Sequence, residues 1–126
     1  MAIRRLDHVN VVTANLAEMV AWYEAVLGLR IGYRPDFPFG GAWLYAGDAA
    51  LVHLVEDSAR PRTGSEVDLK LEHFAFSASD LSAFEQKLKA HGTPFKKTEV
   101  RDAGIVQFHV SDPDGNHIHI DFDLNE

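Results

Sequence analysis

One phrase of this sequence occurs twice, and that repetition constrains the fold more than any other feature. The segment Leu6-Asp7-His8-Val9 returns as Leu71-Glu72-His73-Phe74, so that two histidines stand 65 positions apart. At the same offset, three further apolar positions match: Leu16 with Leu81, Met19 with Phe84, and Tyr23 with Leu88. Self-similarity over tens of residues is the signature of a repeated structural unit. We therefore expect two copies of one module, each opened by a histidine.

Each copy shows the periodicities of a strand, a helix and three further strands. The first helix follows Asn15, with Glu18 placed for a capping box, and the second follows Asp80. Glycines at positions 28 and 92 end these helices. The expected strands span residues 3–12, 29–34, 42–46 and 50–56 in the first copy, and 71–78, 95–101, 105–111 and 116–122 in the second.

Alternation along the strands separates an apolar face from a polar one. Ile118 and Ile120 lie on one face of the last strand, and His119 and Asp121 lie on the other. Helices bury against apolar faces, so the histidines are left on the opposite side. We predict an α+β fold in which two tandem βαβββ modules form a curved mixed sheet around a cleft, with helices outside. The expected organisation is a single domain over residues 1–126, with module one at 1–56, a linker at 57–69 and module two at 70–126.

Composition narrows the possible partners and location. The formal charge of −7 argues against nucleic acid and anionic membranes, because phosphate binding needs a basic face. There are no cysteines, which excludes a thiolate nucleophile and a zinc–thiolate site. Because the sequence lacks an apolar signal core and a membrane-spanning run, we expect a cytoplasmic protein. A chain of 126 residues gains from dimerising, so a homodimer is expected.

Four histidines occupy corresponding places in the two copies. His8 and His53 fall on the first and last strands of the first copy, and His73 and His119 on those of the second. Neutral imidazole is the commonest protein ligand for zinc, iron, nickel and copper. One strand histidine alone is more often structural, but the duplicated placement favours a shared metal site. His109 and His117 are candidates for the surrounding wall, and His91 lies at a helix end without an assigned function.

Several motifs in register make the chain resemble the vicinal-oxygen-chelate superfamily. They are the opening Leu-Asp-His-Val, the helix end Val26-Leu27-Gly28-Leu29, Val52-His53-Leu54, and Asp112-Pro113-Asp114-Gly115-Asn116. The superfamily includes glyoxalase I, methylmalonyl-CoA epimerase, fosfomycin- and bleomycin-resistance proteins and extradiol dioxygenases. The resemblance covers nearly the whole chain and implies paired modules around one divalent metal, often in a dimer. The ligand positions that it implies fall on His8, His53, His73 and His119.

The chain departs from this family at position 119. Members usually carry glutamate there, whereas this sequence reads Ile118-His119-Ile120. An all-histidine site is more positive than the family's usual site and lacks its obvious general base. Asp121, two residues further along the same strand face, is the nearest replacement, as base or as ligand.

The leading functional hypothesis is a metal-dependent lyase or isomerase of glyoxalase-like type, acting on a small substrate with two neighbouring oxygens. The expected cofactor is one divalent ion (Zn, Ni, Fe, Mn or Co), and the predicted pocket lining is Trp43, Tyr45, Gln107 and His109. One alternative is an extradiol-type dioxygenase with nonhaem iron. The other is a resistance protein that binds a drug or metabolite without turnover; such proteins typically lack the metal ligands, so metal content discriminates between these hypotheses.

Overall fold

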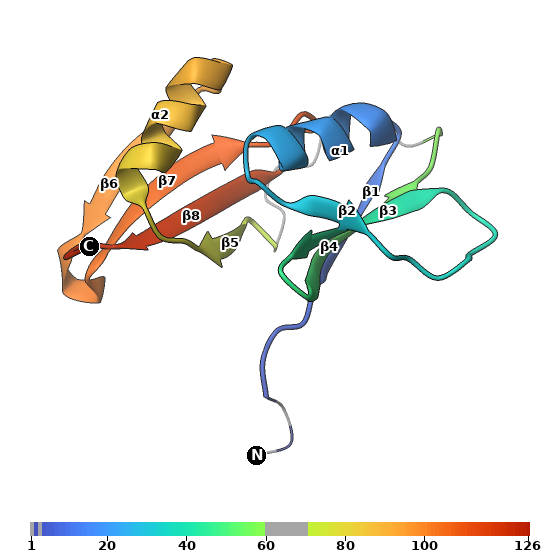
Figure 1. Ribbon diagram of the computed structural model, residues 1–126, viewed down its shortest axis with the longest axis horizontal. Coiled ribbons are helices and arrows are strands. Elements are labelled where there is room, and N and C mark those ends of the chain that lie inside the picture. The colour runs from blue at the N-terminus through green and yellow to red at the C-terminus, as the bar shows by residue number, and fades with distance from the viewer. Residues whose placement is uncertain (1, 3, 60–70) are drawn as a thin grey trace. The chain divides into compact units, whose positions relative to one another are not determined.

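The computed structural model describes residues 2, 4–59 and 71–126 of the chain. Two compact units, Met1–Arg62 and Thr63–Glu126, are present, and each contains a βαβββ element order (Figure 1). The predicted α+β class and the duplicated module are confirmed. Residues 60–69 of the predicted linker, and residue 70 at the predicted start of module two, lie outside the described residues.

The first unit forms a four-stranded mixed sheet with one helix. Its strands lie in the order β1-β4-β3-β2, with β1 parallel to β4 and the other neighbours antiparallel. The elements are β1 (Val9–Thr13), α1 (Leu16–Ala25), β2 (Arg30–Gly32), β3 (Gly41–Ala46) and β4 (Ala49–Glu56).

The second unit repeats this topology with the strand order β5-β8-β7-β6, in which β5 and β8 are parallel. Its elements are β5 (Phe74–Ser77), α2 (Leu81–His91), β6 (Lys96–Val100), the short 3₁₀ helix η1 (Arg101–Ala103), β7 (Ile105–Ser111) and β8 (His117–Asp123). The strands therefore form two four-stranded sheets, one in each unit.

In the first unit, α1 buries Met19, Trp22 and Tyr23, and the sheet buries Leu44 and Leu54. The predicted capping box is wrong in its details. Asn15 precedes the helix, but its side-chain amide donates to the Glu18 carboxylate at 2.7 Å and makes no bond to the backbone of the first turn.

In the second unit, aromatic rings join the helix to the sheet. Phe84 of α2 packs edge-on against Phe108 of β7 and also contacts Phe122 of β8. Phe108 and Phe122 are almost fully buried, as the alternating pattern predicts. Asp80 caps α2 by accepting from the Ala83 backbone N–H at 3.3 Å. With this face covered, the other side chains of β7 and β8 project from the opposite face.

The first strand of each unit is shorter than predicted, because it begins just after the repeated histidine. β1 starts at Val9 and β5 starts at Phe74, so His8 and His73 lie in the segments that lead into these strands. Neither helix of the described chain has the length and apolar character needed to cross a membrane.

Candidate metal centre

The register of the second sheet aligns polar side chains in rows across its strands. Directly paired residues on neighbouring strands project from the same face, so each row forms a continuous strip. The rows are Ser111–His117, Lys96–His109–His119 and Thr98–Gln107–Asp121. Four of the residues predicted from sequence, Gln107, His109, His119 and Asp121, therefore lie on one face.

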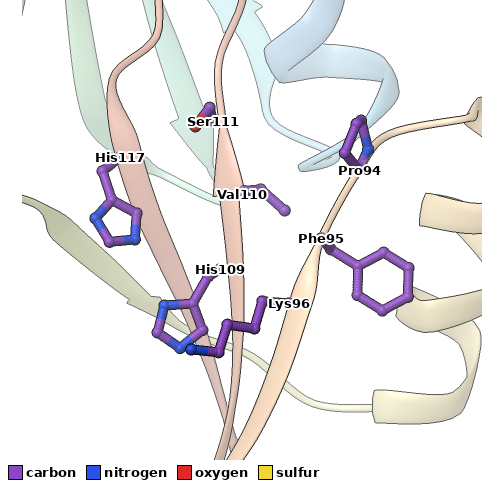
Figure 2. A pocket seen from close by; sticks show the side chains of 7 residues that line it. All are labelled: Pro94, Phe95, Lys96, His109, Val110, Ser111 and His117. Carbon is purple, nitrogen blue, oxygen red and sulfur yellow. The ribbon is translucent and has the colours of Figure 1, made fainter.

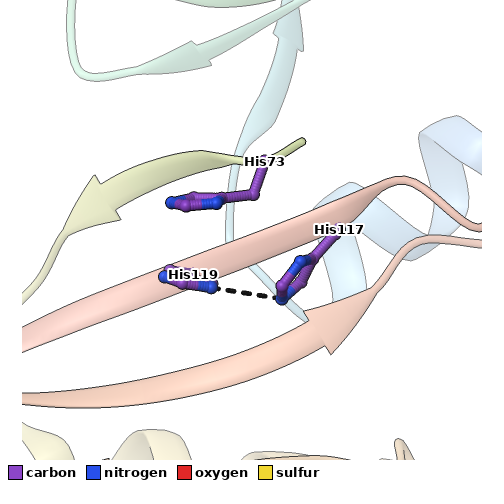
Figure 3. A group of neighbouring side chains, drawn as sticks. All are labelled: His73, His117 and His119. Carbon is purple, nitrogen blue, oxygen red and sulfur yellow. Dashed lines mark hydrogen bonds between the residues drawn. The ribbon is translucent and has the colours of Figure 1, made fainter. Parts of the chain in front are cut away.

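A cluster of three imidazoles lies at one end of this face. His73, His117 and His119 each offer a ring nitrogen, and these nitrogens all lie within 4.8 Å of one another (Figure 3). The rings of His73 and His119 are stacked, with centroids 3.9 Å apart. The Nε2 atoms of His119 and His117 are 3.1 Å apart. The structure thus joins two predicted ligands and adds His117 to them.

Glu72 orients two of these rings at once. One carboxylate oxygen lies 2.8 Å from His73 Nδ1, and the other is hydrogen-bonded to His117 Nδ1. The bonds from His117 and His73 lower the pKa of Glu72 to about 2, so its carboxylate is ionised at neutral pH. An ionised carboxylate accepts, so Nδ1 of each ring carries the proton and Nε2 is left as an acceptor or ligand atom.

The first unit contains the corresponding pair. His8 and His53 are stacked with centroids 3.8 Å apart and planes 11° apart, which closely matches the His73–His119 pair. Asp7 accepts from His8 Nδ1 at 2.7 Å, as Glu72 does from His73. The repeat therefore extends from the sequence to the geometry of the side chains.

The histidine rings of both pairs are suited to binding a metal ion. His53 Nε2 and His119 Nδ1 are buried and have no hydrogen-bond partner among the described residues. Burial lowers the pKa of both histidines, assisted by neighbouring histidine charges, and so favours the neutral form that binds metals. A buried nitrogen without a partner is costly, and a bound cation would satisfy it. The residues present therefore fit a divalent ion.

The remaining predicted residues have varied surroundings. Trp43 stacks on His53 with centroids 3.9 Å apart, so it flanks the histidine pair. The Tyr45 hydroxyl donates to the Tyr33 carbonyl at 2.5 Å. The Oδ1 atom of Asp121 is buried without a hydrogen-bond partner among the described residues. His109 Nε2 is held 3.0 Å from the Thr98 hydroxyl.

Sequence reasoning missed the acids that orient the histidines. Asp7 and Glu72 directly precede His8 and His73, and this repeated acid–histidine pair was the available signal. Nothing in the local pattern indicated that Glu72 also bonds to His117, 45 positions away.

Comparisons with known proteins agree with this architecture. The model of the Glyoxalase/Bleomycin resistance protein/Dioxygenase superfamily matches residues 5–120. The chain is 31% identical over 121 residues to Glyoxylase I 4 of Arabidopsis thaliana, covering 91% of this chain and 68% of that protein.

Two solved structures show the same fold. A glyoxylase/bleomycin resistance protein/dioxygenase domain from Frankia sp. EAN1pec has a TM-score of 0.80 at 17% identity, covering 97% of this chain and 99% of its own. Lactoylglutathione lyase from Agrobacterium tumefaciens has a TM-score of 0.68 at 16% identity, covering 97% and 96%. By the family match and the plant relative, this chain belongs to the glyoxalase/bleomycin resistance protein/dioxygenase superfamily.

Proposed function

We propose that this protein is a metal-dependent enzyme of glyoxalase-like type, a lyase or isomerase for a small substrate with two neighbouring oxygens. The observation that carries the proposal is the matched imidazole pair in each unit, His8 with His53 and His73 with His119. Membership of a superfamily that includes glyoxalases supports an enzyme at a general level.

The proposal assigns one divalent ion (Zn, Ni, Fe, Mn or Co) to His8, His53, His73 and His119 together. Such an ion would supply Lewis-acid polarisation of the substrate oxygens. Buried ring nitrogens without hydrogen-bond partners on His53 and His119 support this assignment.

The proton-transfer role is assigned to Asp121. Its Oδ1 atom is buried, has no hydrogen-bond partner among the described residues, and belongs to the same strand face as His119. An unpartnered carboxylate oxygen can take a proton from a substrate carbon next to a polarised carbonyl. Gln107, paired with Asp121 across β7 and β8, can donate a hydrogen bond that orients the substrate.

Metal content tests the proposal. Replacing His73 with Ala removes one proposed ligand and leaves the nitrogen cluster incomplete, so we expect the variant to lose its ion. The matched control is His91→Ala, which removes an exposed imidazole at the end of α2 and should keep the ion. Native mass spectrometry of untagged protein reports the number of ions per chain. Retention of one ion per chain by the His73 variant would contradict the site.

The same spectrum reports the oligomeric state, for which we propose a homodimer. Ile31, Tyr33 and Phe39 of the first unit are 55%, 75% and 45% exposed, and such large exposed apolar side chains are candidates for contact with a second chain. A mass corresponding to one chain across the micromolar range would contradict the dimer.

The second candidate is an extradiol-type dioxygenase. Nonhaem iron oxygenases commonly combine two histidines with one carboxylate, and Asp121 offers an unpartnered oxygen two residues from His119. Native iron with oxygen-dependent turnover of a catechol would favour this candidate. Zinc or nickel with oxygen-independent turnover would favour the lyase or isomerase. Absence of any divalent ion, with thermal stability unchanged by EDTA, would instead indicate a binding protein.

A further inference from the structure

The second unit contains a cavity of about 470 Å³, and its lining side chains are shown in Figure 2. Its lining consists of Pro94, Phe95, Lys96, His109, Val110, Ser111 and His117. His117 also belongs to the three-imidazole cluster that contains the proposed ligands His73 and His119, so the cavity adjoins these ligands. The volume is within the range of sites for small molecules.

Lys96 brings a positive charge to this cavity. It pairs with His109 across β6 and β7, and so projects from the histidine face of the sheet. Lys96 is the one lysine or arginine among the residues that line this cavity.

The next residue in the sequence, Lys97, lies on the opposite face of the second sheet from Lys96. Lys97 points to the helix side, where its ammonium bonds to Glu85 at 2.9 Å and lies over the Phe108 ring. Lys96 has no carboxylate partner among the residues that the structure describes. Its charge is therefore available to a ligand, with the hydroxyl of Ser111 in the same cavity.

We propose that the cavity binds the carboxylate of an anionic substrate through Lys96. This inference rests on the proposed function and specifies its substrate class: a small molecule with two neighbouring oxygens at one end and a carboxylate at the other. A carboxylate suits the site better than a doubly charged phosphate, because one ammonium group balances one negative charge. Phe95, Pro94 and Val110 provide apolar contact for the spacer between the two ends.

Two probes isolate the carboxylate contact. Catechol and 3,4-dihydroxybenzoate both present two neighbouring oxygens, and only the second carries a carboxylate. Their dissociation constants are measured by calorimetry on zinc-loaded full-length protein without oxygen, for the wild type, Lys96→Gln and the control Lys87→Gln. The control makes the same substitution at an exposed position of α2, outside the cavity lining. Comparing the ratio of the two constants between the wild type and each variant cancels the difference in metal affinity between the probes.

Lys96→Gln should weaken 3,4-dihydroxybenzoate binding about tenfold and leave catechol binding unchanged, because only the charged hydrogen bond is lost. Lys87→Gln should leave both constants unchanged. Zinc-dependent catechol binding together with equal affinities of the wild type and Lys96→Gln for 3,4-dihydroxybenzoate would overturn this inference alone. Absence of zinc-dependent binding of either probe to the wild type would overturn both this inference and the proposed function.

Discussion

Glu72 shows how one carboxylate can orient two histidine rings for metal binding. Its two oxygens bond to Nδ1 of His73 and of His117, which fixes the proton positions of both rings. Asp7 holds His8 in the same way in the first unit, and its hydrogen bond with His8 lowers the pKa of its carboxyl. Carboxylates that bond to the far nitrogen of a ligand histidine orient the ring and raise its basicity. The acid before each repeated histidine therefore belongs to the proposed site.

Replacing Glu72 with Gln should weaken metal binding by about 10- to 100-fold, because an amide cannot accept from both rings. The matched control is Glu99→Gln, an exposed acid on β6 that pairs with Arg101. Competition against a coloured chelator measures the affinity of each variant. Equal affinities for the wild type and Glu72→Gln would show that this carboxylate does not support the ligands.

At the scale of residues, the sequence could predict which histidines form pairs, but not all of the residues that contact each pair. The offset between His8 and His73 predicted matched partners, and the His8–His53 and His73–His119 pairs have similar stacked geometry. His117 was expected only in the surrounding wall, because nothing local indicates its contact with Glu72. Contacts between residues far apart in sequence depend on strand register, which local patterns do not determine.

At the scale of elements, the aromatic core under the second sheet holds the histidine face in place. Phe108 is fully buried and touches the rings of Phe84, Phe95 and Phe122. Its neighbours along β7, Gln107 and His109, project from the opposite face. The packing of α2 on the sheet therefore sets the position of the polar rows.

Phe108→Ala should lower the free energy of unfolding by about 3–5 kcal/mol, because it removes a buried ring and leaves a cavity. Leu71→Ala serves as the control, since Leu71 is 72% exposed, and should cost less than about 1 kcal/mol. Urea unfolding followed by circular dichroism measures both. Similar losses for the two variants would contradict the assignment of Phe108 to the core.

Alternation predicted the core strands well and the first strand of each unit less well. Residues 105–111 were predicted as a strand and form β7, whereas the strand predicted from residue 3 begins at Val9. The reason is that β1 exists only where it pairs with β4, from Val9 opposite Val52 to Thr13 opposite Glu56. The alternation of apolar residues continues into the segment before Val9, but no strand of the described chain pairs with that segment. The short helix η1 was not predicted, and the strand predicted over residues 95–101 includes its first residue, Arg101.

At the scale of the whole molecule, duplication provides two similar units, each with one stacked histidine pair. The second unit has a third clustered imidazole, His117, and an adjoining cavity. The central claim is that both stacked histidine pairs are metal ligands. The contrasting arrangement is an ion held by His73, His117 and His119 alone, which would leave His8 and His53 without a role in metal binding.

The decisive measurement is the zinc affinity of His8→Ala, determined by chelator competition on full-length protein beside His73→Ala and His91→Ala. A ligand role for both pairs predicts one zinc per chain in the wild type and a loss of more than about 100-fold in both His8→Ala and His73→Ala, since loss of a ligand should exceed loss of an orienting group. His91→Ala should bind as the wild type does. Wild-type affinity in His8→Ala, with binding lost only in His73→Ala, would contradict the claim.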